Sequence, residues 1–182
     1  MVLLQPNLID VWRAQNGQRF TLRLIRPADW LLLGNLVERV SQATRYNRFH
    51  SALRSLPADV LQGMTYVDSR RQVALVVTTR SASEEIIVAD VRYVVERDDD
   101  AEFAILVDDP YQRLGLATRA MNALGAAAYA AGIRSLYGSV LGSNSAMLAM
   151  TRQCGFSRAA DREDRRLVHV RTCVDALVSP PA

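Results

Sequence analysis

Short stretches of the chain alternate apolar and polar residues, and this period-2 pattern predicts half-buried β-strands. The clearest example is residues 19–26 (RFTLRLIR), in which apolar and basic side chains take turns. Six later stretches have alternating or β-branched compositions that also favour strands. They are residues 72–80, 85–97, 101–107, 133–141, 156–160 and 165–173.

The segments between these strands carry the start and stop signals of helices. Pro27 takes a first helical position, and Asp29 lies in the first turn, where a carboxylate complements the helix dipole. Ser41 is a suitable N-cap for the next helix, and Gly132 and Gly155 end the two later ones. The predicted helices cover residues 27–40, 41–52, a short segment from residue 57, residues 114–131 and residues 144–154.

The resulting order of elements, β-α-α-α-β-β-β-α-β-α-β-β, is typical of an α+β domain in which helices pack on one central sheet. A chain of 182 residues is long enough for one domain with a full core. We place this core at about residues 18–173 of a single domain. Residues 1–16 are predicted to be a loose or helical lead-in, and residues 176–182 a frayed tail.

The composition is that of a soluble globular protein, with 49% hydrophobic and 23% charged residues. No apolar run approaches the roughly 20 residues that span a bilayer, and the N-terminus lacks the basic region of a signal peptide. We therefore expect a cytoplasmic protein without membrane contact. The net charge is +3, and all 22 basic residues are arginines. They are scattered among acidic residues, so nucleic acid is not an expected partner.

The sequence contains no metal-binding motif. Its cysteines, Cys154 and Cys173, and its histidines, His50 and His169, lack the spacing of metal ligands. We therefore predict no metal site. In a reducing compartment the two cysteines are expected to be free thiols, with one of them packed in the core.

The strand at residues 101–107 leads through a short loop into a long alanine-rich helix. The loop contains Gln112, Gly115 and Ala117 in a Gln-x-x-Gly-x-Ala motif. A helix N-terminus leaves backbone N–H groups unpaired and carries partial positive charge, and small residues let a ligand come close. The loop is therefore suited to a pyrophosphate, although an ordinary strand-to-helix turn has the same character. The glycine patterns of dinucleotide-binding folds and P-loops are absent.

This motif resembles the acetyl-CoA signature of the GCN5-related N-acetyltransferase (GNAT) superfamily, and the order of elements is similar to that fold over nearly the whole chain. Asn144 and the helix end at Gly155-Phe156 also match the family's pattern. Residues 45–49 (RYNRF) and 101–103 (AEF) resemble the branch that contains bacterial protein lysine acetyltransferases. The resemblance implies a mixed, mostly antiparallel sheet of six to seven strands flanked by helices.

The resemblance also implies which residues hold acetyl-CoA, the expected co-substrate. Backbone N–H groups of the loop would bind the pyrophosphate, and the Thr118 hydroxyl would add a contact. Leu106 and Val107 would pair through their backbones with the pantetheine arm, in the gap where their strand splays from the 133–141 strand. Asn144 would contact the arm from the following helix. The implied cofactor-binding residues are Leu106, Val107, Gln112, Arg113, Leu114, Gly115, Ala117, Thr118 and Asn144.

An amine must lose a proton before it attacks a thioester, so the implied reaction needs a base. The resemblance makes Glu102 the candidate catalytic base, and alternation places it on the strand face of Ala104 and Leu106. An apolar setting there would raise its pKa, whereas the alternative is an ordinary surface glutamate. The backbone N–H of Leu106 is the expected oxyanion donor. Thr151 replaces the tyrosine with which many relatives protonate the leaving thiolate.

Two functions stay open at this point. The first is an N-acetyltransferase that moves the acetyl group of acetyl-CoA to a primary amine, on a protein lysine or a small molecule, in a ternary complex. The second is a catalytically inactive acyl-CoA sensor or scaffold, which Thr151 favours slightly. The closing strands would allow a homodimer. Tyr46 and Arg48 are candidates to contact the acceptor and His50 to line its cleft, although surface positions are commoner for such residues.

Overall fold

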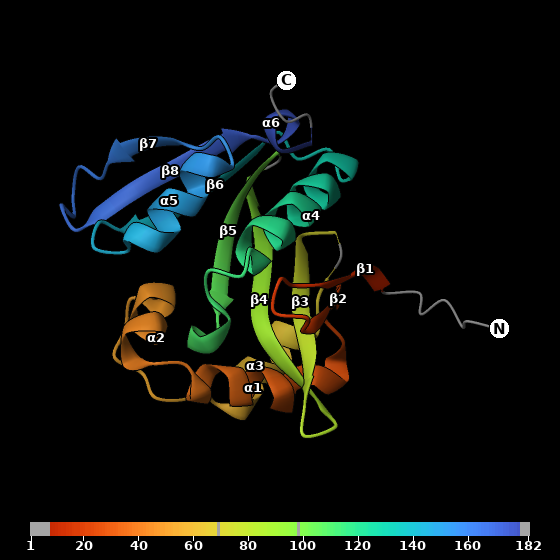
Figure 1. The fold of residues 1–182 in the computed structure, drawn as a ribbon. Helices are drawn as coiled ribbons and strands as arrows, with labels where there is room; N and C mark the ends of the chain where they lie inside the picture. Colours follow the sequence, from red (N-terminus) through yellow and green to blue (C-terminus); the bar gives the residue numbers. More distant parts are fainter. Residues whose placement is uncertain (1–7, 69, 98, 179–182) are drawn as a thin grey trace.

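The computed structural model describes residues 8–68, 70–97 and 99–178, which form a mixed sheet with helices on both faces (Figure 1). The strands are β1 (Leu8–Arg13), β2 (Arg19–Leu24), β3 (Gln72–Ser81), β4 (Glu84–Arg97), β5 (Asp100–Val107), β6 (Ser135–Leu141), β7 (Ser157–Ala160) and β8 (Leu167–Cys173). The helices are α1 (Trp30–Arg39), α2 (Gln42–Phe49), α3 (Ala58–Thr65), α4 (Leu116–Ala130), α5 (Ser145–Gln153) and α6 (Val174–Val178). Short 3-10 turns, η1 (Pro27–Asp29) and η2 (Asp109–Tyr111), precede α1 and α4.

Within the described residues, eight strands form one sheet in the order β1-β2-β3-β4-β5-β6-β8-β7. The neighbouring pairs are antiparallel except for β5 and β6, which run parallel. The α+β fold and its mostly antiparallel sheet are therefore confirmed. The sheet has one strand more than the upper limit of the six to seven that were predicted.

The additional strand is β1, which falls in the segment predicted to be a loose or helical lead-in. It pairs with β2, and Trp12 lies against Phe20 of that strand with 5.6 Å between ring centroids. Arg119 of α4 lies 4.6 Å from the Trp12 ring centroid and forms an ion pair with Asp10 at 2.5 Å. The prediction was wrong here because a strand of 6 residues is too short for a clear alternation of apolar and polar residues. In addition, Arg119, which contacts this strand, is distant from it in the sequence. The rest of the predicted lead-in, residues 1–7, lies outside the described residues.

β5 and β6 pair only over a short distance. The register joins residues 100–102 of β5 to residues 135–137 of β6, and the ladder stops there. β5 continues to Val107 and β6 to Leu141. The two strands therefore splay, as predicted, and no strand of the described residues pairs with the free edge of the second half of β5.

The sheet separates the hydrophobic core into two parts, and helices cover one part on each face (Figure 1). Residues of α4, α5 and α6 pack on one face together with Phe103 of β5. Residues of α1, α2 and α3 pack on the other face together with Leu106. Successive side chains of a strand point to opposite faces, so Glu102 and Ala104 share the face of Leu106, as predicted.

The chain after β8 forms the short helix α6, where a frayed tail was predicted. Leu177 of α6 is 8% exposed and packs on α4 at Gly125. A Cβ added to Gly125 would lie only 2.7 Å from the Leu177 Cβ, so glycine is required for this approach. The core therefore extends beyond residue 173, and the predicted tail from residue 179 onward lies outside the described residues.

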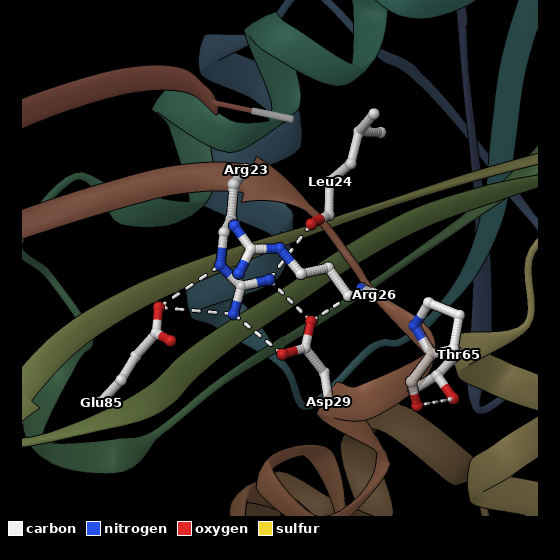
Figure 2. Close-up of polar contacts among 7 residues, drawn as sticks. Arg23, Leu24, Arg26, Asp29, Thr65 and Glu85 are labelled. Atoms are coloured by element: carbon white, nitrogen blue, oxygen red, sulfur yellow. Dashed lines mark hydrogen bonds and ion pairs between the residues drawn. The ribbon is translucent and has the colours of Figure 1, made fainter. Parts of the chain in front are cut away.

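A buried ion pair fixes the turn from β2 into α1 (Figure 2). The Arg23 side chain is 2% exposed, and its Nη1 and Nη2 donate to the two carboxylate oxygens of Asp29 at 2.6 and 2.9 Å. The Asp29 carboxylate also accepts the backbone N–H of Arg26 at 2.7 Å, and Glu85 of β4 lies 3.3 Å from Arg23 Nε. The basic side chain can be buried because these carboxylates neutralise it.

We expect Asp29→Ala to lower the free energy of unfolding by about 3–5 kcal/mol, because the buried guanidinium of Arg23 then loses its main counter-charge. Urea titration followed by circular dichroism measures this value. The matched control is Asp99→Ala, which removes an exposed ion pair with Arg134 and should cost less than about 1 kcal/mol. Equal losses in the two variants would contradict the role given to Asp29.

Candidate active site

An open groove of about 1270 Å³ follows the gap between β5 and β6. Residues of β5, β6, α2, α5 and the loop before α4 form its walls. Leu114 packs its side chain against the core on the α4 face, so only its backbone is available to a ligand. The other predicted site residues all line the groove, namely Glu102, Leu106, Val107, Gln112, Arg113, Gly115, Ala117, Thr118 and Asn144.

The loop before α4 presents a row of unpaired backbone donors, which we call the anion cradle. Arg113 and Gly115 have positive φ angles of 63° and 77°, and Gly115 is the N-cap of α4. In the part of the chain that the structure describes, the backbone N–H groups of residues 113–118 have no hydrogen-bond acceptor. A Cβ added at Gly115 would meet no atom within 4 Å. Successive donors at an accessible helix N-terminus are suited to bind an anion.

Side chains tie this loop to the start of α2. The Gln112 amide nitrogen donates to the backbone oxygen of Val107 at 3.1 Å and to the Thr44 hydroxyl oxygen at 3.3 Å. The Asp109 carboxylate accepts hydrogen bonds from the N–H and hydroxyl of Ser41 and from the Thr44 hydroxyl, at 2.7, 2.8 and 2.7 Å. The Gln112 amide nitrogen therefore fixes the loop, and α2 is held in a defined position beside the anion cradle.

The backbone of β5 turns alternate residues toward the gap. The Asp108 N–H donates to the backbone oxygen of Val88 in β4, and every second residue of an antiparallel ladder points both its groups toward the same partner. Leu106 therefore turns its N–H and C=O toward β4, and its side chain is buried. The backbone N–H and C=O groups of Ile105 and Val107 point toward the gap instead. This corrects the expectation that Leu106 offers its backbone to the cofactor arm and its N–H to an oxyanion.

Gly138 of β6 lies where the two strands begin to part, and it lines the groove. A Cβ at this position would lie 3.2 Å from the backbone oxygen of Phe103 and 3.1 Å from its ring. A larger residue would therefore push β6 away from β5 and alter the mouth of the gap. The sequence interpretation missed this residue, although an isolated glycine within a strand is a known signal of close backbone approach.

Glu102 lies in the same groove, five residues before the end of β5. Burial and the neighbouring Glu96 carboxylate raise the pKa of Glu102, and electrostatic interactions with Arg48 and His50 partly oppose this shift. Glu96 itself accepts a hydrogen bond from Tyr137, and burial together with that bond raises the pKa of Tyr137 to about 12. A carboxylate with a raised pKa is a stronger proton acceptor.

The hydroxyl of Thr151 and the amide oxygen of Asn144 both form hydrogen bonds with the backbone of α5. Thr151 is fully buried, and its hydroxyl donates to the backbone oxygen of Leu148 at 3.1 Å. Thr151 is therefore not a substitute for the tyrosine of the family pattern. Asn144 caps α5 by accepting the backbone N–H of Met147 at 3.1 Å, so its amide nitrogen is the group that it can offer to a ligand.

The C-terminal half of α2 and the residue after it form one wall of the groove. Arg48 and His50 line the groove, whereas Tyr46 is 37% exposed and does not. Asn47 and Phe49 also line it, and the sequence interpretation missed both. Asn47 and Phe49 reach the groove because α2 packs close to β5, and local sequence patterns do not predict such tertiary packing.

A mixed sheet that splits beside a free strand edge, with an anion cradle and a carboxylate along the split, defines a coenzyme A-dependent acyltransferase. Residues 19–157 match the family described as acetyltransferase (GNAT) domain, so the chain belongs to this family of acetyl-CoA-dependent N-acetyltransferases. It is 27% identical over 150 residues to Acetyltransferase PA5475 of Pseudomonas aeruginosa. This match covers 82% of the present chain and 81% of that protein.

Solved structures share the fold. The GNAT domain of S. lividans PAT has a TM-score of 0.80 and 24% identity, and the match covers 90% of this chain and 96% of that one. The cAMP-binding acyltransferase from Mycobacterium smegmatis has a TM-score of 0.62 and 25% identity, and the match covers 96% of this chain. The chain spans about half the length of that acyltransferase, 51%.

Three further findings concern residues 8–68, 70–97 and 99–178. No group of three or more His, Cys, Asp or Glu side chains there is arranged to hold a metal ion. No helix in these ranges is both long enough and apolar enough to cross a membrane. Cys154 is buried and Cys173 is exposed, and both are free thiols, as predicted.

Proposed function

We propose that this chain transfers the acetyl group of acetyl-CoA to a primary amine by direct attack while both substrates are bound. The observation that carries the proposal is one continuous groove that contains both the anion cradle and Glu102. The Vibrio cholerae spermidine N-acetyltransferase, which has the same fold at 15% identity and a TM-score of 0.69, was solved in complex with CoA and spermine. That complex supports a coenzyme A site in this fold.

The residues of the groove fit acetyl-CoA. The free N–H groups of residues 113–118 can hold the pyrophosphate, and the Thr118 hydroxyl lies in the same groove. Ile105 offers its C=O to the pantetheine arm, whereas Val107 offers its N–H because its oxygen already binds Gln112. The amide nitrogen of Asn144 is available from the other side of the groove.

Acetyl-CoA supplies an activated acetyl thioester, and the chain supplies the groups that make an amine react with it. Glu102 takes a proton from the ammonium form of the acceptor, which gives a nucleophilic amine. The N–H of Ile105, which faces the gap, stabilises negative charge on the thioester oxygen. A thiol ionises near pH 8.5, roughly, so the leaving thiolate does not require the acid that Thr151 fails to provide.

Initial-rate kinetics test this mechanism. Acetyl-CoA and each amine of a panel, including a lysine-containing peptide, are varied together while the released CoA thiol is measured. Reciprocal plots should intersect, because both substrates must be bound before the acetyl group moves. Parallel lines would indicate an acetylated enzyme intermediate and contradict direct attack. Binding of acetyl-CoA without transfer to any amine would support the alternative function, a catalytically inactive sensor or scaffold.

A further inference from the structure

Arg48 is a cation in the groove for which the described part of the chain provides no hydrogen-bond or ion-pair partner. Its guanidinium forms no hydrogen bond and no ion pair with any of those residues, and its Nε is buried without an acceptor. The guanidinium carbon lies 4.9 Å from the centroid of the Phe49 ring. Buried polar atoms in proteins are nearly always hydrogen-bonded, so a ligand is the natural acceptor for this group.

Among the described residues, two other side chains have a buried polar atom without a hydrogen-bond partner, and both form hydrogen bonds through another atom. The Nη1 of Arg45 donates to the backbone oxygens of residues 37, 38 and 40. The Oδ2 of Asp108 accepts from Arg39 Nε at 2.6 Å. Arg48 differs from them because its guanidinium has no such contact and lies in the groove.

The position of Arg48 points to the acceptor and away from the pyrophosphate. Its electrostatic neighbours are Asp90, Arg92 and Glu102. Asp90 and Arg92 satisfy each other through two hydrogen bonds of 2.6 and 3.0 Å. Burial lowers the pKa of Arg48, and Asp90 and Glu102 oppose this, but a guanidinium remains charged at neutral pH. Glu102 lies five residues, ~17 Å, before the end of β5, where the chain turns toward the anion cradle.

The helix that carries Arg48 is also held in place. Its first turn is tied to the cradle loop by hydrogen bonds from Ser41 and Thr44 to Asp109 and from Gln112 to Thr44. Arg48 follows one turn later on this 8-residue helix. A group bound by Arg48 is therefore positioned relative to a thioester bound along β5.

We propose that the acceptor is an amine that also carries a carboxylate, of which an amino acid is the simplest form. Its amine lies at Glu102 and its carboxylate at Arg48, so the two charges of the zwitterion meet opposite charges. A guanidinium fork binds a carboxylate through two parallel hydrogen bonds. A polyamine would instead place a second cation against Arg48. This inference rests on the proposed function, because it assigns the acceptor half of the same groove.

Paired acceptors test the inference. The purified protein is supplied with acetyl-CoA and with each amino acid, its carboxamide, and spermidine, and kcat and KM are measured for each. For the preferred amino acid, kcat/KM should exceed that of its carboxamide by about 100-fold, since the amide lacks the charge that Arg48 binds. Arg48→Met should bring this ratio close to one, mainly by raising KM for the amino acid, and Arg48→Lys should restore part of it. Arg134→Met, at an exposed site outside the groove, should keep the ratio.

The remaining outcomes overturn the inference. Equal use of an amino acid and its carboxamide, or a preference for spermidine, would show that the carboxylate is not recognised. Equal losses on both acceptors in Arg48→Met would assign Arg48 to the positioning of Glu102 alone. Calorimetric titration of acetyl-CoA into the wild-type protein distinguishes a failure of this inference from a failure of the proposed function. If acetyl-CoA binds and only amines without a carboxylate are acetylated, this inference fails and the proposed function stands; if acetyl-CoA does not bind, both fail.

Discussion

Replacement of Glu102 by glutamine should lower kcat for acetyl transfer by about 10²–10⁴-fold, the usual contribution of a general base. Glutamine keeps the size of the side chain and removes its ability to take a proton from the acceptor ammonium. Glu102 lies ~17 Å along β5 from the cradle loop, so the affinity for acetyl-CoA should stay close to that of the wild type. Steady-state rates of CoA thiol release, with calorimetry for acetyl-CoA, measure the two quantities separately.

The pH dependence of the wild-type rate should carry the signature of the same residue. Burial and the Glu96 carboxylate raise the pKa of Glu102 above its ordinary value of 4.5. Only the carboxylate form accepts a proton, so kcat/KM should fall as the pH falls through this raised pKa. The rate should recover as the pH rises above it. The profile of the glutamine variant should lack this acidic limb.

A matched substitution at Glu96 checks the cause of the shift. Glu96 is one of the groups that raise the pKa of Glu102, but it does not line the groove. Glu96→Gln removes the repulsion between the two carboxylates, and the acidic limb should move to lower pH.

A Glu102→Gln variant with the wild-type kcat and an unchanged acidic limb would show that another group is the base.

Local sequence patterns predicted much of the fold because strand alternation and helix capping depend on residues that are close together in the sequence. The period of residues 19–26 identified β2, and Ser41 was correctly expected to cap α2, where its hydroxyl accepts the N–H of Thr44. The same patterns could not reveal β1, whose ion pair and ring contact come from Arg119 in α4. They also gave no sign that Arg23 is buried, because its partner Asp29 reaches it only after the chain turns.

In the candidate site, too, local features could be predicted from the sequence, whereas features that depend on tertiary packing could not. The Gln-x-x-Gly-x-Ala motif located the cradle loop, since a helix start after a strand is a local feature. The direction of each backbone group along β5 depends on its pairing with β4, and this pairing assigns the gap to Ile105 and not to Leu106. Arg48 was only one candidate of several, because the approach of α2 to Glu102 is set by tertiary packing.

Gly115→Glu is the second substitution with a large expected effect. A glutamate there adds a negative charge and bulk to the anion cradle, where the structure leaves open space. It should weaken acetyl-CoA binding by at least about 100-fold, or roughly 3 kcal/mol. Any side chain at this position is also strained, because Gly115 has a φ of 77°. A control must therefore carry the same strain.

Gly132 provides that control. It follows the opposite end of α4, has the same φ of 77°, and a Cβ added there also meets no atom within 4 Å. Gly132→Glu introduces the same charge and the same backbone strain away from the groove. Any loss of binding that appears only in Gly115→Glu is therefore a property of the anion cradle. Circular dichroism and urea titration of both variants establish that each is folded.

Calorimetric titration of acetyl-CoA into the wild type, Gly115→Glu and Gly132→Glu tests the central claim most directly. The cradle predicts saturable binding to the wild type and to Gly132→Glu, and loss of binding in a Gly115→Glu protein that is still folded. Equal binding by all three proteins would place the pyrophosphate elsewhere, and absence of binding to the wild type would contradict the coenzyme A site itself.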